Sequence, residues 1–160
     1  MKKTLLCMLM FLFLLPFWGC SEKLPHKANL HLNTSFIGKI GEMSLSGLLI
    51  YSEEGQMYME ISTPDELKGL SFSFDEELTI GYRGLNAMSE GDYLSSSSFV
   101  MGIKNALDSI RLNNPTPTKE DENTYLFQSK SDSGCSKVYT DVKGDVLKLV
   151  VGQVEIDFVN

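Results

Sequence analysis

Basic residues are scarce in this chain, and histidines are scarcer. Lysine and arginine make up 14 of the 160 residues, against 21 aspartates and glutamates, and the formal net charge at pH 7 is −7. This balance argues against nucleic-acid binding, which needs a basic surface, and against a polybasic segment for anionic lipids. The two histidines, His26 and His31, lie in a polar segment and on the polar side of a predicted strand. A two-histidine metal site is therefore not expected.

Catalytic sequence signatures are also missing. We find no Gly-x-Ser-x-Gly, His-Glu-x-x-His or Cys-x-x-Cys motif and no phosphate-binding glycine loop. Acidic runs at residues 75–77 and 120–122 lack the alternating spacing of a calcium loop, so we interpret them as solvated turns. The serines at residues 95–98 are interpreted as helix caps, since the sequence places no base beside them. We expect a protein that is not an enzyme and has no cofactor.

The N-terminal segment is typical of a secretory signal. Lys2 and Lys3 precede an apolar run from Leu5 to Leu15. This run is shorter than the roughly 20 apolar residues that span a bilayer comfortably. The segment therefore predicts export of the protein across a membrane.

The residues that follow the apolar run include a small residue followed by a cysteine, Gly19-Cys20. This pair resembles the lipobox of bacterial lipoproteins, although Phe17 and Trp18 depart from its usual residues. The resemblance implies that Cys20 receives a lipid and becomes the new N-terminus. The alternative is an uncleaved anchor with an incidental cysteine.

We expect three parts: a signal in residues 1–19, a lipidated N-terminus and polar tether in residues 20–28, and one β domain in residues 29–160. More than one acyl chain is needed for stable anchoring, and a diacylated or triacylated Cys20 meets that condition. The protein would then stay on the extracytoplasmic face of a membrane, in an envelope with one membrane or two. In the mature chain, Cys135 would have no cysteine to pair with, and we interpret it as a small core hydrophobe.

Most of the mature chain alternates apolar and polar side chains with a period of two, which predicts antiparallel strands. One helix is expected over residues 97–112, because apolar residues recur there at spacings of three and four. The predicted fold is mainly β (α+β): a curved antiparallel sheet or incomplete barrel, with the helix and a short helical turn on its concave side. The expected strands cover residues 30–40, 43–51, 57–61, 70–74, 78–82, 124–130, 135–140, 146–151 and 154–158.

The short helical turn is expected at residues 63–69. Thr63 is a suitable N-cap, Pro64 fits the first helical position, and Glu66 would complete a capping box. Gly69 would end the turn.

Residues 55–70, with the sequence Gly-Gln-Met-Tyr-Met-Glu-Ile-Ser-Thr-Pro-Asp-Glu-Leu-Lys-Gly-Leu, resemble the lipoprotein-carrier-like (LolA-like) superfamily. Residues 80–85 continue the resemblance, which covers residues 30–158 as architecture. It implies an incomplete antiparallel barrel, or half-barrel, around a hydrophobic cavity that accepts acyl chains. This chain departs from the family's soluble carriers in being lipid-anchored itself, so a shuttle role does not carry over.

A set of apolar residues on the inner faces of the expected strands and helix is the candidate site. If the sheet is partly empty these residues line an apolar pocket, and if the helix fills the sheet they are ordinary core. The leading hypothesis is a membrane-anchored protein that binds an acyl chain, such as palmitate, or another apolar ligand. The rival is a structural or protein-interaction module of the cell envelope. The candidate pocket residues are Phe36, Leu45, Met57, Met59, Ile61, Phe72, Phe74, Ile80, Tyr82, Val100, Ile103 and Leu107.

Overall fold

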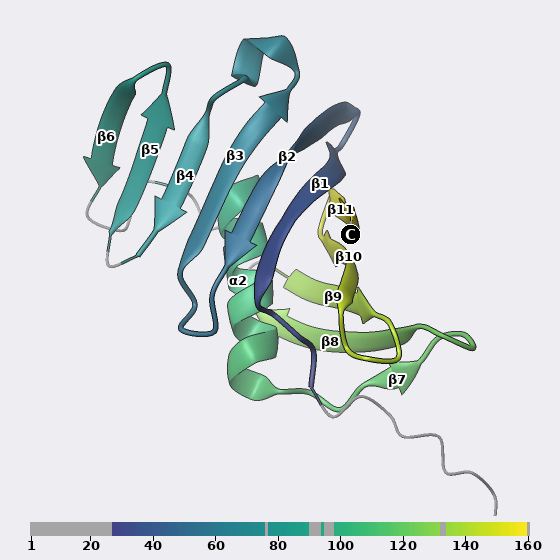
Figure 1. The fold of residues 1–160 in the computed structure, drawn as a ribbon. Helices are drawn as coiled ribbons and strands as arrows, with labels where there is room; N and C mark the ends of the chain where they lie inside the picture. Colours follow the sequence, from purple (N-terminus) through teal and green to yellow (C-terminus); the bar gives the residue numbers. More distant parts are fainter. Residues whose placement is uncertain (1–26, 76, 90–93, 95–97, 132–133, 160) are drawn as a thin grey trace, which may run out of the picture.

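The computed structural model describes residues 27–75, 77–89, 94, 98–131 and 134–159. The predicted signal, Cys20 and all but the end of the predicted tether lie outside these residues. Within them, eleven strands form one antiparallel sheet that bends round a long helix, α2 (Figure 1). The strand order is β6-β5-β4-β3-β2-β1-β11-β10-β9-β8-β7, so β6 and β7 are the two edges and the sheet does not close. The predicted fold class is confirmed.

The alternating sequence pattern explains the strands. In β2, for example, Leu45, Gly47 and Leu49 are buried and the residues between them are more exposed. The strands are β1 (Leu32–Ile40), β2 (Met43–Tyr51), β3 (Met57–Thr63), β4 (Ser71–Phe74), β5 (Leu78–Tyr82), β6 (Leu85–Ser89), β7 (Thr118–Lys119), β8 (Tyr125–Ser131), β9 (Gly134–Thr140), β10 (Val146–Val151) and β11 (Val154–Val159). The terminal strand β11 pairs with β1, which joins the two halves of the sheet.

Curvature of the sheet has a local cause at Gly47. The register between β2 and β3 shifts between Ser46 and Gly47, and such a bulge bends a strand and increases its twist. A β-carbon at Gly47 would lie 2.0 Å from the backbone oxygen of Glu60 and 2.9 Å from the Phe36 ring. Glycine therefore allows the close strand approach at this bend.

Helix α2 (Phe99–Asn113) lies on the concave side of the sheet and fills its centre. Ser98 is the N-cap, and its side chain accepts a hydrogen bond from the Met101 amide at 3.4 Å. The buried face of the helix is Val100, Gly102, Ile103, Ala106, Leu107 and Ile110. The helix packs mainly against β8 and also contacts β9, β10 and β11. The predicted helix and its serine cap are confirmed, while Ser95, Ser96 and Ser97 lie outside the described residues.

The predicted helical turn is present, but the prediction of Thr63 as its N-cap is wrong. A 3-10 helix covers Asp65–Leu67, and its N-cap is Pro64 without a side-chain cap hydrogen bond. Thr63 is still part of β3, where its hydroxyl bonds with that of Ser46 at 2.6 Å and so is engaged across the sheet. Gly69 has a φ of +79°, as the ending of the turn requires. Leu67 packs against the core from this turn.

Two strands and one cysteine differ from the expectations. The strands β6 and β7 are not among the expected ones, since Leu85–Ser89 has no clear apolar alternation and Thr118–Lys119 is only two residues long. A tight turn at Arg83 and Gly84, both with positive φ, pairs β6 with β5. Cys135 is exposed and not part of the core. It is the second residue of β9 and lies on the side away from the buried residues of that strand.

Alanine substitutions at two glycines test this packing, and we expect them to change the free energy of unfolding in opposite directions. Gly47→Ala places a methyl group against the backbone of β3, and we expect a loss of about 1–3 kcal/mol in the free energy of unfolding. Gly102→Ala places its methyl 3.6 Å from Val151, an ordinary contact. It should gain about 0.5–1 kcal/mol, because alanine favours a helix over glycine. Urea unfolding of both variants measures this, and equal effects would contradict the assigned packing.

Candidate functional site

A row of apolar residues runs across the concave face from β2 to β6. Leu49, Met59, Phe72, Ile80 and Ala87 are successive cross-strand partners, and directly opposite residues lie on the same face of a sheet. Leu49 and Met59 are fully buried and Phe72 is 6% exposed, whereas Ile80 is half-buried and Ala87 is exposed. Cover along this row therefore decreases toward β6.

The start of α2 explains where this cover decreases. Phe99, the first residue of α2, packs edge-on against Phe72, with ring centroids 5.9 Å apart and planes at 88°. In Figure 1, β5 and β6 extend past the helix. Four half-buried apolar side chains near this boundary pack against the core from β4, β5 and the turn before β4: Leu67, Leu70, Phe74 and Ile80. We call these four residues the concave margin.

The twelve candidate pocket residues occupy two different environments. Phe74 and Ile80 belong to the concave margin, and Tyr82 is half-buried, with its hydroxyl donating to the Glu66 carbonyl at 2.7 Å. The other nine are at most 6% exposed and belong to one packed cluster: Phe36, Leu45, Met57, Met59, Ile61, Phe72, Val100, Ile103 and Leu107. Side chains this buried leave no room for a ligand beside them unless α2 moves.

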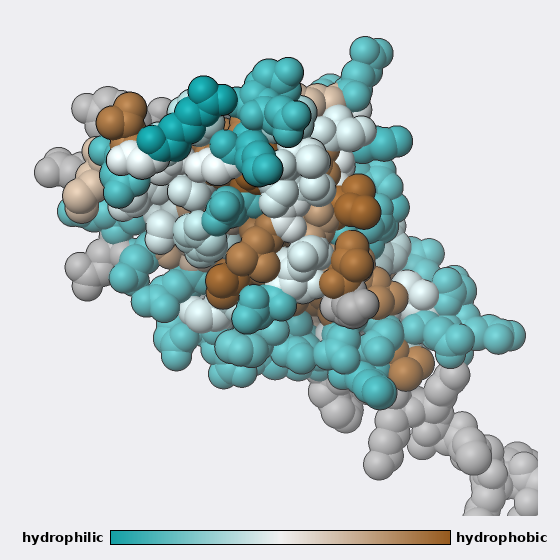
Figure 2. Space-filling view, turned by 45° about the horizontal axis from the view of Figure 1, so that its top comes forward, coloured by the Kyte–Doolittle hydropathy of each residue, from teal (hydrophilic) through white to brown (hydrophobic). Residues whose placement is uncertain are grey.

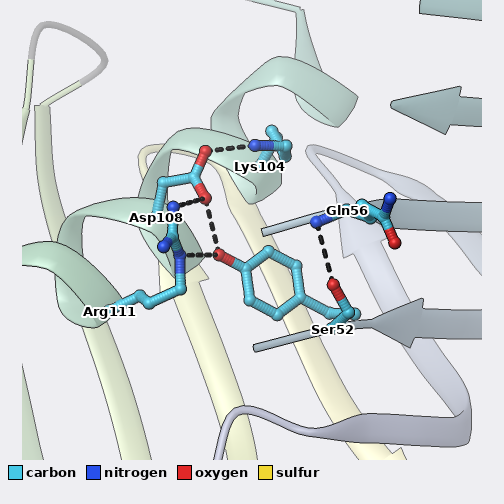
Figure 3. A network of polar contacts seen from close by, with 6 residues as sticks. Ser52, Gln56, Lys104, Asp108 and Arg111 are labelled. Carbon is cyan, nitrogen blue, oxygen red and sulfur yellow. Dashed lines mark hydrogen bonds and ion pairs between the residues drawn. The ribbon is translucent and has the colours of Figure 1, made fainter. Parts of the chain in front are cut away.

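A polar clamp holds the other end of α2 to β2, and sequence reasoning missed it. The Tyr51 hydroxyl donates to Asp108 Oδ1 at 2.6 Å and accepts from Arg111 Nε at 3.2 Å (Figure 3). Arg111 Nη2 also lies 3.4 Å from Asp108 Oδ1, and Lys104 pairs with the second oxygen of Asp108. We call Tyr51, Lys104, Asp108 and Arg111 the helix clamp. The spacing of its three helical charges was visible in the sequence, but their partner Tyr51 is 57 residues away from Asp108.

The clamp changes the acid–base behaviour of Tyr51. Burial and the adjacent Asp108 carboxylate both disfavour a phenolate and raise the pKa of Tyr51 well above its ordinary value of 10.0. The same hydroxyl raises the pKa of Arg111. At neutral pH the clamp therefore consists of a neutral phenol between a carboxylate and a guanidinium.

The polar candidates from the sequence are dispersed. His31 is exposed, and no group of three or more His, Cys, Asp or Glu among the described residues is placed to hold a metal ion. Asp75 accepts a hydrogen bond from Gln56 at 2.6 Å, and Asp121 accepts one from the Asn123 amide at 2.9 Å, so both lie in ordinary turns. No helix within the described ranges is long and apolar enough to cross a bilayer.

The surface is mixed in polarity. Figure 2 shows one face of the molecule, on which apolar side chains form separate groups between hydrophilic ones. The largest exposed apolar side chains include Leu85 at 76% and Met88 at 72%, both on the edge strand β6. The concave margin and β6 thus form the apolar end of the sheet, and the clamp lies at the opposite end of the helix.

Comparison with known proteins places the fold in context. No model of a known protein family matches this chain, and no curated protein sequence matches it. The chain is similar to an uncharacterized conserved protein from Thermus thermophilus, with 13% identity, a TM-score of 0.47, and 79% of this chain and 74% of that chain covered. It is also similar to a LolA superfamily protein from Nitrosomonas europaea, with 7% identity, a TM-score of 0.43, and coverage of 84% and 87%. Any function must be argued from this chain's own residues.

The clamp predicts a pH-dependent contribution to stability. Tyr51→Phe should cost about 1.5–3 kcal/mol at neutral pH, because it removes hydrogen bonds to charged groups. Since the folded-state pKa of Tyr51 is raised, its contribution is complete below about pH 10 and declines as the pH rises further, when the unfolded state loses the proton first. Urea unfolding should show that the difference in free energy of unfolding between the parent and Tyr51→Phe becomes smaller above pH 10. A difference that stays constant above pH 10 would contradict the assignment of this stability to the Tyr51 hydroxyl.

Proposed function

We propose that this chain is a membrane-anchored lipoprotein, not an enzyme, whose β domain holds an acyl chain or another apolar group along the concave margin. The supporting observation is the row from Leu49 to Ala87, in which apolar side chains continue beyond the cover of α2. Burial of apolar surface contributes a favourable free energy of roughly 25 cal/mol for each Å² removed from water. An apolar ligand along this margin would therefore bind favourably.

We place the proposed ligand at the concave margin because the interior is occupied. Met59, Ile61 and Ile103 are fully buried within one packed cluster, and opening a site there would require α2 to separate from the sheet. Occupation of the margin leaves this core intact. A single acyl chain, which is long and narrow, suits a strip of side chains along β4 and β5 better than a bulky ring system does.

The anchor rests on the sequence alone. The N-terminal apolar run and Gly19-Cys20 support export and lipidation at Cys20. The test is metabolic labelling with a fatty acid, which should mark the parent chain and not Cys20→Ala. Equal label in both would contradict the proposed anchor.

A rival function has its own supporting observation. The filled core, together with exposed Leu85 and Met88 on β6, favours a cell-envelope protein that binds a protein partner. The strand β6 has the sequence Leu-Asn-Ala-Met-Ser, without the charged residues or proline that commonly protect an edge strand from pairing. Such an edge is a template for an added strand.

The two functions are separated by a pair of substitutions on opposite faces of the sheet. Ile80→Ser removes an apolar side chain from the concave margin, whereas Met88 pairs with Thr79 on the other face. We expect Ile80→Ser to weaken binding of a fluorescent fatty-acid probe about tenfold, while Met88→Ser leaves the Kd unchanged. Fluorescence titration measures both. If the parent protein shows no saturable probe binding, the ligand-binding proposal fails and the interaction module replaces it.

A further inference from the structure

A hollow of about 250 Å³ lies where the chain enters the domain. Its walls come from residues 27–30, from the β2–β3 hairpin and from the last turn of α2. The lining residues are Lys27, Ala28, Asn29, Leu30, Glu53 and Arg111. None of them belongs to the concave margin, so this hollow is a separate site.

One wall carries an immobilised cation. Arg111 is held by Tyr51 and Asp108 in the helix clamp, and it also lies against Gly55, where a β-carbon would come within 2.7 Å of Nη2. Because Asp108 also pairs with Lys104, one carboxylate is shared between two cations. A guanidinium that is already fixed loses little further conformational entropy when it binds an anion.

The remaining walls carry opposite charges. Lys27 and Glu53 both line the hollow, yet no ion pair joins them, and neither forms an ion pair with any other described residue. Asn29 fixes the Lys27 segment by donating from its amide to Gly144 O at 2.7 Å and from its side chain to Asp145 at 2.9 Å. Two cations and one carboxylate therefore line this hollow together with the buried residues Ala28 and Leu30.

We propose that this hollow binds a zwitterionic phosphoethanolamine group, with the phosphate between Arg111 and Lys27 and the ammonium at Glu53. Arginine suits phosphate because its guanidinium carries five N–H donors, of which the clamp uses one on Nε and one on Nη2. The volume is below the roughly 300–1,000 Å³ typical of sites for drug-sized molecules, which fits a small polar group. Phosphatidylethanolamine and free phosphorylethanolamine share this chemistry. The proposal does not depend on ligand binding at the concave margin.

Isothermal titration calorimetry of O-phosphorylethanolamine into the full-length chain, in a nonionic detergent, tests the site. We expect saturable binding to the parent. Glu53→Gln should weaken phosphorylethanolamine about tenfold and leave inorganic phosphate unchanged, because only the ammonium contact is lost. Lys27→Gln should weaken both ligands about tenfold. Matched controls are Glu54→Gln and Lys68→Gln, whose exposed side chains do not line the hollow.

The proposal is overturned if the parent shows no saturable heat with phosphorylethanolamine. It is equally overturned if Glu53→Gln and Lys27→Gln behave like their controls. When the parent binds, competition by nanodiscs identifies the source of the group. Loss of the phosphorylethanolamine signal in phosphatidylethanolamine nanodiscs, and not in phosphatidylcholine nanodiscs, assigns the site to the lipid head group. If the phosphorylethanolamine signal is retained in both kinds of nanodisc, the site is assigned to the soluble compound.

Discussion

The burial of one face of α2 in a sheet that is too wide to stay flat is the constraint on which this structure depends. Eleven antiparallel strands with apolar residues on one face must curl, and only one long helix among the described residues is available to cover that face. The six buried residues of α2 fill the centre of the curve. The bend at Gly47 and the pairing of β11 with β1 bring the two halves of the sheet round the helix.

The two ends of the helix then acquire different chemistry. At its N-terminus Phe99 meets Phe72, and beyond this contact Ile80 is half-buried and Ala87 is exposed. At its C-terminus the helix clamp fixes α2 to β2 through the two hydrogen bonds of Tyr51, whose partners Asp108 and Arg111 form ion pairs within the helix. One end therefore presents apolar surface and the other presents fixed charge beside the point where the chain enters the domain. The two proposed ligand sites lie at these opposite ends of the helix.

Alternation and helical spacing predicted most of the fold because these patterns record burial directly. The strand Met43–Tyr51 has the bounds that were expected, and α2 begins two residues later than expected. The failures occur where burial gives no signal. Leu85–Ser89 is an exposed edge strand held by backbone pairing, and Thr63 bonds to Ser46 across the sheet although its sequence context fits a helix cap. The sequence also placed the candidate residues on the inner face, but it did not indicate which of them α2 would cover. Tyr51 and Asp108 meet only after folding, so the clamp had no local signature.

The central claim is that an apolar ligand occupies the concave margin while the core around α2 stays closed. Methyl NMR of isotope-labelled isoleucines during titration with a fatty acid tests it most directly, because Ile80 lies at the margin and Ile61 and Ile103 lie in the core. The account predicts saturable shifts of the Ile80 methyl signals, with those of Ile61 and Ile103 unmoved. Large shifts at Ile61 and Ile103 would show that α2 leaves the sheet to admit the ligand, which contradicts the account.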